Sequence, residues 1–260
     1  MILDGTAAQS IATGAALIRA GGLLGLPTET VYGLAADADN AEAVAQIFKA
    51  KGRPADHPLI VHVRDATGVD HFARDVPDFA RALIAAFWPG PLTLILPRRD
   101  GVAAASAGGQ DSIGLRSPSH PVAQALLKAC LDASAGSAVW GVAAPSANQF
   151  GRVSPTTAAH VQGEFGDSVT VLDGGPCTVG IESTIIDCTR GVPVLLRPGA
   201  ITPAQVQAVC GLAVRTKESL EDHAAPAPRA SGTLESHYAP RAKVRLMDAK
   251  ALQSALDLLG

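Results

Sequence analysis

Residues 26–38 read LPTETVYGLAADA, and residues 49–63, which follow a short helical segment, read KAKGRPADHPLIVHV. Together they place a hydroxyl-rich turn, two cations and two histidines within one strand–helix–strand unit. Pro and Gly separate these groups and stop regular structure around them. Such a density of polar groups between apolar strands indicates a ligand site.

The same alternation of apolar strands and helices continues outward from this unit. Strands are expected at residues 23–26, 59–63, 92–96, 112–115, 139–143, 170–172, 184–187 and 194–196. Helices are expected at residues 6–20, 41–49, 78–87, 122–131, 154–165, 202–209 and 249–259. The last three strands lie close together, with connections too short for helices, so some of them must pair antiparallel. The prediction is an α/β fold with a mixed parallel and antiparallel sheet flanked by helices.

Four of these helices begin with a capping pattern. Two have the spacing of a capping box and two place proline after a capping hydroxyl: Thr6 with Gln9, Asp39 with Glu42, Ser154-Pro155 and Thr202-Pro203. Between the elements, residues 98–111 are rich in Gly, Ala and Ser and lack periodicity, so we expect a mobile surface loop there.

Composition divides the chain into three parts. Residues 1–216 carry the alternating pattern and form the predicted main domain. Residues 217–240 include HAAPAPRASG and are typical of a linker with polyproline character. Residues 241–260 supply one strand and one helix, too little for an independent core, so they either dock on the main domain or begin a C-terminal α/β domain that this chain leaves incomplete.

Charge and composition exclude several classes of protein. The formal net charge of −3 provides no global basic field for sequence-independent nucleic-acid binding. The longest apolar runs fall far short of the roughly 20 residues of a membrane helix, and residues 1–10 lack a signal-peptide pattern. We therefore expect a cytoplasmic protein without a membrane partner. Cysteine and histidine spacings predict neither a zinc site nor a disulfide framework.

The first candidate site residues lie in the turn PTETVYG. Pro27 and Gly33 hold this turn out of the sheet at the carboxyl end of a strand, where open α/β sheets bind ligands. Its polar groups can equally form a turn that caps the next element. The residues alone leave both interpretations open.

A second group combines Lys51, Arg53, His57 and His62. The cations follow a helix, where they favour its dipole and can face solvent, and a lone strand histidine is more often a satisfied core residue than a ligand group. Prolines on both sides of His57 make this backbone rigid, however. Cations and histidines that converge on one strand end make a phosphate or carboxylate site credible.

Arginine recurs at strand boundaries elsewhere in the chain. Arg116 ends a buried-looking strand before a proline turn and must pair with an anion, internal or bound. Arg197 ends a strand before a turn, and Arg53 stands beside Pro and Gly. Each of these arginines alone would be ordinary, and their repetition at strand boundaries is what favours an anion site.

Hydroxyl groups accompany these arginines. VAAPSANQFGRVSPT brings Ser146, Asn148 and Ser154 to a helix N-terminus, and GIESTIID puts Ser183 at a strand start. Helix capping and anion binding by Ser154 are compatible. The chain has no GxxxxGK[ST] or GxGxxG loop, so a nucleotide would be held by side chains. The absence of GxSxG and paired-carboxylate motifs leaves covalent hydrolase chemistry with little support.

Nine segments in order resemble the YrdC-like family, the L-threonylcarbamoyladenylate synthases, and in particular its longer members with a linker and a C-terminal domain. The segments are PTETVYGL, KGRPADHPLIVHV, FWPGPLTLIL, SIGLRSP, APSAN, SPT, GIESTIID, LLRPG and SHYAP. The resemblance implies that residues 1–216 are a YrdC-like catalytic domain whose twisted sheet surrounds a deep, positively lined cavity. It also implies the synthesis of threonylcarbamoyl-AMP and pyrophosphate from L-threonine, bicarbonate and ATP, for threonylcarbamoyladenosine in tRNA next to the anticodon.

The resemblance further implies a set of site residues. The expected catalytic residues are Lys51, as partner of the phosphates, and Arg53. The expected L-threonine residues are Thr30, His62, Arg116, Ser146 and Ser183. The expected ATP residues are Arg53, His57, Ser112, the Ala144 backbone, Ser154, Arg197 and Tyr238, which would reach back from a linker that acts as a lid. His57 and Ser112 stand where many relatives have Asn and Thr, and Mg²⁺ would accompany ATP with no protein ligand identified.

Two other functions stay open at this point. One is carbamoyl transfer from carbamoyl phosphate, as in the YrdC-like modules of hydrogenase-maturation proteins, whose acylphosphatase and zinc-finger modules this chain lacks. The other is a noncatalytic RNA-binding module, which the net charge and the lack of an aromatic-interleaved basic patch disfavour. The partners implied for a synthase are the downstream tRNA threonylcarbamoyl transferase machinery, with direct tRNA binding left open.

Overall fold

The computed structural model describes residues 1–216, 228–229, 240, 242 and 244–258. Its strands are β1 (Ile2–Asp4), β2 (Leu24–Leu26), β3 (Gly33–Asp37), β4 (Ile60–Val63), β5 (Leu92–Pro97), β6 (Ser112–Arg116), β7 (Gly141–Ala143), β8 (Thr170–Asp173), β9 (Thr184–Asp187), β10 (Val194–Arg197) and β11 (Arg215–Thr216). Its α-helices are α1 (Ala8–Arg19), α2 (Ala41–Lys51), α3 (Thr67–Phe72), α4 (Asp78–Phe87), α5 (Pro121–Leu131), α6 (Ala158–Phe165), α7 (Pro203–Cys210) and α8 (Ala249–Asp257).

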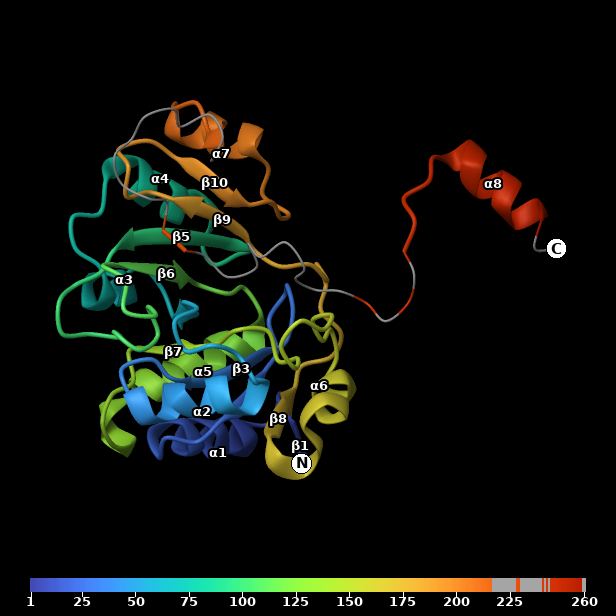
Figure 1. The fold of residues 1–260 in the computed structure, drawn as a ribbon. Helices are drawn as coiled ribbons and strands as arrows, with labels where there is room; N and C mark the ends of the chain where they lie inside the picture. Colours follow the sequence, from blue (N-terminus) through green and yellow to red (C-terminus); the bar gives the residue numbers. More distant parts are fainter. Residues whose placement is uncertain (217–227, 230–239, 241, 243, 259–260) are drawn as a thin grey trace.

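Within the described residues the strands form one continuous mixed sheet in the order β1-β8-β2-β3-β7-β4-β6-β5-β9-β10-β11. Neighbours pair parallel at β4–β6 and β5–β9 and antiparallel at β2–β3 and β5–β6. Figure 1 shows α4 and α7 beside the β9–β10 end, and α1, α2 and α5 at the opposite end. The predicted mixed α/β sheet is confirmed.

Two apolar cores cover the two faces of this sheet. Successive residues of β3 alternate between them, because side chains along a strand point to opposite faces. Leu34 and Ala36 join the larger core with α2 and α4, whereas Ala35 joins the smaller core with α1 and α5. This division leaves the strand ends near Leu26 and Arg116 available for a polar site.

Strand β3 was not predicted, because the sequence was interpreted as strand, polar turn and then helix. Its residues GLAAD are small and lack the β-branched or aromatic side chains typical of strands. The chain needs small residues here: a Cβ added at Gly33 would lie 3.0 Å from the Cβ of Ala144. The quoted opening unit is therefore a hairpin of β2 and β3, followed by α2 and β4.

Three of the four predicted N-cap residues are wrong. The N-cap of α1 is Ala7, because Thr6 hydrogen-bonds to Asp4 instead. Asn40, not Asp39, caps α2 by accepting from two backbone N–H groups. Helix α6 begins after Thr157, three residues beyond Ser154. The Thr202 prediction is confirmed, since Thr202 and Gln205 form a capping box at α7.

Two tertiary expectations are also corrected. Residues 98–111 lie partly at the surface, as expected, but the segment is anchored in the fold, since Ser106 is fully buried and its hydroxyl donates to the Ala38 carbonyl at 2.8 Å. The three last predicted strands do not lie together. β9 and β10 pair antiparallel as expected, but β8 crosses to the other end of the sheet and pairs parallel with β1 and β2.

The C-terminal part is described only from residue 244 to residue 258 and at isolated positions before it. Residues 244–248 form no strand, contrary to expectation, and α8 lies apart from the sheet with no buried residue (Figure 1). The predicted linker falls almost entirely outside the described residues. Among the helices that are described, none has both the length and the apolar character to span a membrane.

Candidate active site

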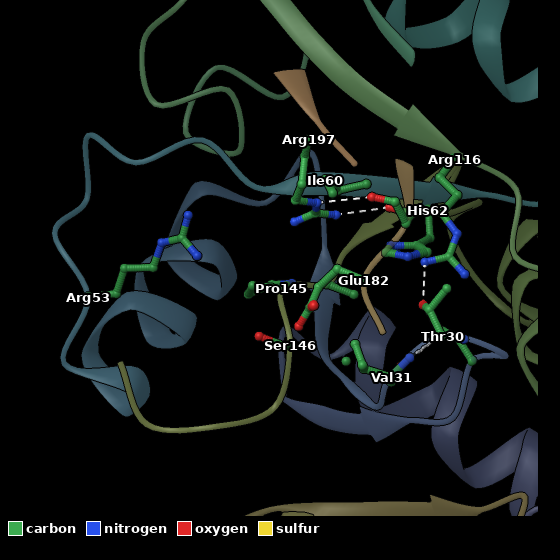
Figure 2. Close-up of a pocket in the computed structure, with 14 residues that line it drawn as sticks. Thr30, Val31, Arg53, Ile60, His62, Arg116, Pro145, Ser146, Glu182 and Arg197 are labelled. Carbon is green, nitrogen blue, oxygen red and sulfur yellow. Dashed lines mark hydrogen bonds between the residues drawn. The ribbon is translucent and has the colours of Figure 1, made fainter. Parts of the chain in front are cut away.

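A polar cavity opens at the strand ends that the sequence singled out (Figure 2). Its lining residues come from the turn after β2, from β3, β4, β6 and β10, and from the segments after α2, after β7 and before β9. They are Thr28, Thr30, Val31, Gly33, Arg53, Ile60, His62, Arg116, Ala144, Pro145, Ser146, Glu182, Ser183 and Arg197. Eight of the predicted site residues thus share one cavity: Thr30, Arg53, His62, Arg116, Ala144, Ser146, Ser183 and Arg197.

The turn after β2 is buried and internally hydrogen-bonded. The Thr28 hydroxyl accepts from the backbone N–H of Val31 at 3.2 Å and donates to the carbonyl of the same residue at 2.6 Å. Local side-chain bonds of this kind replace strand pairing and hold a tight turn. The turn therefore directs Glu29 and Thr30 into the protein. Its interpretation as a structural turn is confirmed, and its interpretation as a ligand site stays a prediction.

Arg116 anchors the deep side of the cavity. It is the last residue of β6 and is paired in register with His62 of β4. Its guanidinium donates to the Thr30 hydroxyl at 2.8 Å and to the Gly90 carbonyl at 3.2 Å, and it forms an ion pair with Glu29 at 2.7 Å. The anion that the sequence required for Arg116 is thus internal, as buried charges demand.

His62 is a neutral imidazole in this environment. It is 4% exposed, and burial, with a smaller effect of the nearby Arg116 charge, lowers its pKa to about 3. Its Nδ1 atom has no hydrogen-bond partner within the part of the chain that the structure describes. A buried imidazole nitrogen without a partner in a polar cavity is suited to a hydrogen bond with a ligand.

Arg197 and Arg53 approach the cavity from other elements. Arg197 donates to the Ser183 carbonyl and to the Ser183 hydroxyl, each at 3.0 Å, and the same hydroxyl lies 2.7 Å from that of Thr93. Arg53 donates to the Pro58 carbonyl at 3.0 Å. Three guanidinium groups from separate segments therefore line one cavity, which makes it a strong site for phosphate or carboxylate groups.

Lys51 lies behind the wall of the cavity rather than among its lining residues. Its ammonium donates to the carbonyls of Ser146 and Asn148, both at 2.5 Å, and holds the segment after β7. Burial, with a smaller effect of Arg53, lowers the Lys51 pKa to about 7. The role of Lys51 as a phosphate partner stays a prediction.

The other predicted ATP residues lie around the cavity. Ser112 lines a neighbouring pocket of about 290 Å³ that shares Ile60 with the cavity. His57 contacts the ring of Phe150 edge-on, and burial lowers its pKa. The Ser154 hydroxyl donates to Glu182 at 2.5 Å instead of capping a helix. Tyr238 falls outside the described residues.

Glu182 and Glu29 are the residues that sequence reasoning left without a role. Glu29 was noted within the turn, but its ion pair with Arg116 spans 87 positions and has no local signal. Glu182 directly precedes the predicted Ser183, and its position in the motif GIESTIID was the available signal. Among the described residues no group of three or more His, Cys, Asp or Glu side chains could hold a metal ion.

Comparisons with known proteins agree on one family. Residues 16–199 match the family model Sua5_yciO_yrdC, described as telomere recombination, and residues 201–258 match Sua5_C, described as the C-terminal domain of threonylcarbamoyl-AMP synthase. A threonylcarbamoyl-AMP synthase from Bacillus subtilis is 41% identical over 92% of this chain and 66% of its own length. One from Pyrococcus abyssi is 41% identical over 90% of this chain and 66% of its own length.

A solved structure agrees with these sequence matches. The crystal structure of Pyrococcus abyssi Sua5 complexed with L-threonine has a TM-score of 0.85 and 38% identity to this chain, over 97% of this chain and 73% of the other. The chain spans about two thirds of the length of the curated relatives that it matches.

Proposed function

Because this chain belongs to the Sua5/YrdC family, we propose that it is a threonylcarbamoyl-AMP synthase. The proposed reaction joins L-threonine, bicarbonate and ATP into threonylcarbamoyl-AMP, pyrophosphate and water. The names of the Bacillus and Pyrococcus relatives support this activity, and the L-threonine bound to the Pyrococcus protein supports the amino-acid substrate.

The observation that carries the proposal is the convergence of Arg53, Arg116 and Arg197 on one cavity. The substrates are a carboxylate, a bicarbonate and a triphosphate, so every one of them brings negative charge. A cavity lined by three guanidinium groups and several hydroxyls matches that chemistry. A site for a neutral ligand would not need to bury so much positive charge.

In this proposal, residues around Arg116 hold the amino acid: Thr30, His62, Arg116, Ser146 and Ser183. The nucleotide is held by residues toward Arg53 and Arg197: Arg53, His57, Ser112, Ala144, Ser154 and Arg197. Tyr238, the remaining residue expected to bind ATP, lies outside the described residues. Mg²⁺ would arrive on the triphosphate, since Mg²⁺ is commonly bound by one or two carboxylates together with substrate phosphates. The residues present agree with an ion that is carried by the phosphates, because among the described residues the lining contributes one carboxylate and no cluster of carboxylates that could hold the ion by itself.

The proposed reaction requires stabilisation of negative charge and positioning of the carbamate against ATP. A carbamate oxygen of N-carboxythreonine attacks the α-phosphorus in line, a P–O bond forms, and the bond to the leaving pyrophosphate breaks. Fixed arginines stabilise the charge that spreads over these oxygens, and no covalent nucleophile is needed. Carbamates lose CO₂ readily in water, so exclusion of water from the site would favour the reaction.

We further propose that the product is consumed by the tRNA threonylcarbamoyl transferase machinery in the cytoplasm. A mixed anhydride of a carbamate and AMP is an activated acyl donor, so its chemistry suits transfer to an amine such as that of adenosine. Whether tRNA itself contacts this chain is a separate question that RNA-binding measurements answer.

One assay tests the proposed activity. Pyrophosphate release is measured from ATP and Mg²⁺ with L-threonine and bicarbonate each omitted in turn. Dependence on both substrates supports the synthase. Release that instead depends on carbamoyl phosphate supports carbamoyl transfer, and RNA binding without any turnover supports a noncatalytic module.

A further inference from the structure

Glu182 is the carboxylate among the residues that line the cavity, and no role has been assigned to it. It stands just before β9 and lines the same cavity as all five proposed L-threonine residues. Figure 2 shows its carboxyl group directed toward Ser146, among the labelled lining side chains. One of its oxygens accepts a hydrogen bond from Ser154.

The charge balance of the cavity makes this carboxylate unusual. Arg116, Arg53 and Arg197 line the same cavity, yet in the part of the chain that the structure describes no cationic group lies within ion-pair distance of Glu182. The Arg116 guanidinium is paired with Glu29 instead, and Arg197 donates to Ser183. An acidic side chain that lines the same cavity as three arginines and forms no ion pair with them is available to a cationic group of a ligand.

We propose that Glu182 binds the α-ammonium group of the amino-acid substrate. The inference rests on the proposed function, which supplies a zwitterionic ligand. Such a ligand needs a cation for its carboxylate, which Arg116 offers, and an anion for its ammonium group. The other proposed amino-acid residues supply hydroxyls, a guanidinium and a neutral imidazole, so Glu182 is the anionic partner among them.

This assignment gives Glu182 a role in specificity. A charge-assisted hydrogen bond from an ammonium group to a carboxylate would favour an α-amino acid over an α-hydroxy acid of the same shape. It would also fix the nitrogen, the atom that must receive the carboxyl group from bicarbonate. Ser154 would orient the carboxylate through its hydrogen bond, since it holds one oxygen and leaves the other directed to the ligand.

The test uses the full chain in buffer with EDTA and without ATP. Calorimetric titrations compare L-threonine with 2,3-dihydroxybutanoate of matching configuration, in which a hydroxyl replaces the amine. Glu182→Gln should weaken L-threonine binding about ten- to a hundredfold, the range expected for loss of a charge-assisted hydrogen bond. Binding of the hydroxy acid should stay within about twofold, and Glu182→Asp should recover part of the L-threonine affinity.

Two controls accompany these variants. Glu42→Gln removes the same charge from an exposed position on α2 and should leave both affinities unchanged. Ser154→Ala removes the hydrogen bond to Glu182 but keeps the carboxylate, so it should cost less L-threonine affinity than Glu182→Gln. Thermal unfolding of every variant checks that the fold is retained.

Four results would overturn the proposal. Unchanged L-threonine binding by Glu182→Gln would do so, as would an equal loss for both ligands. An effect that appears only when the titrations are repeated with Mg²⁺ and ATP in place of EDTA would make Glu182 a metal ligand instead. If the unsubstituted chain binds no L-threonine at all, the proposed function itself fails and this inference fails with it.

Discussion

The carboxylate of Glu29 and the guanidinium of Arg116 form an ion pair 2.7 Å apart, with side chains that are only 7% and 4% exposed. The second Glu29 oxygen accepts from the backbone N–H of Ser119 at 3.1 Å, and Arg116 also donates to Thr30. The pair thus joins the turn after β2 to the end of β6. It sets the position of the arginine that lines the candidate site.

Replacing Glu29 with Gln should destabilise the protein strongly. The substitution removes one partner of a buried ion pair and leaves the Arg116 charge uncompensated, which typically costs about 3–5 kcal/mol. Urea unfolding followed by circular dichroism measures the loss. Glu42→Gln, at an exposed site, serves as the control and should change stability by less than about 0.5 kcal/mol. Equal stability of both variants would contradict a structural role for the pair.

His62 should make stability fall as the pH is lowered. In the unfolded chain its pKa is near the ordinary 6.5, but burial lowers the pKa to about 3 in the fold. Between pH 6.5 and pH 3, His62 is protonated in the unfolded chain but not in the folded protein. The free energy of unfolding should therefore decline by up to about 1.4 kcal/mol for each pH unit below 6.5. Unfolding at several pH values checks this slope.

The matched comparison for that slope is His62→Gln. This variant should show a shallower loss between pH 6 and pH 4, whereas His160→Gln, on the exposed face of α6, should keep the slope of the unsubstituted protein. A slope unaffected by His62→Gln would mean that the imidazole is protonated in the folded protein.

Lys51 should make the free energy of unfolding rise with pH in the alkaline range. The fold lowers its pKa from 10.5 to about 7, so between pH 7 and pH 10.5 the unfolded chain binds more protons and stability rises with pH. Lys51→Met should lack this rise. It should also lose about 1–3 kcal/mol at neutral pH, because two carbonyls lose their donor.

Chemical denaturation at pH 7, 8 and 9 measures both effects of Lys51→Met. Lys49→Met, two residues earlier and exposed, provides the control. A rise with pH that persists in the Lys51 variant would assign the effect to another group. Pyrophosphate release by the same variant tests whether Lys51 also contacts the phosphates.

Arg197→Ala should impair use of ATP. Loss of a charge-assisted contact costs about 1.5–3 kcal/mol, so kcat/KM for ATP should fall by roughly ten- to a hundredfold. The measurement is pyrophosphate release over a range of ATP concentrations. Arg81→Ala, exposed on α4, should show unchanged kinetics. Normal turnover and normal ATP affinity in Arg197→Ala would remove Arg197 from the site.

Much of the fold could be predicted because its signals are local. The expected bounds of α4 agree with the structure at both ends, and the capping box at Thr202 is present as expected. Periodicity and capping depend on residues within one or two turns of each other, so the chain carries them in short windows. Strand β3 was missed because close packing against Ala144 requires its first residue, Gly33, to be small. That contact joins distant parts of the chain and leaves no local signal.

Much of the candidate site could also be predicted, because its residues belong to short motifs that are visible in the sequence. Eight of them line one cavity. Their partners could not be anticipated in the same way. Three contacts join segments that are distant in the chain. They are the ion pair of Glu29 with Arg116, the hydrogen bond from Lys51 to the Asn148 carbonyl, and the hydrogen bond from Ser154 to Glu182.

The sequence by itself determined the alternation of strands and helices, the family, and the inventory of arginines, hydroxyls and histidines. Only the tertiary structure decided that β8 joins β1 and β2, that His62 is buried as a neutral imidazole, and that Glu182 faces the cavity beside the proposed amino-acid residues. The physical reason is that the periodicity of apolar residues and helix capping depend on residues that are close together in the chain. Ion pairs, burial and the pKa values that follow from them depend on which distant segments pack together.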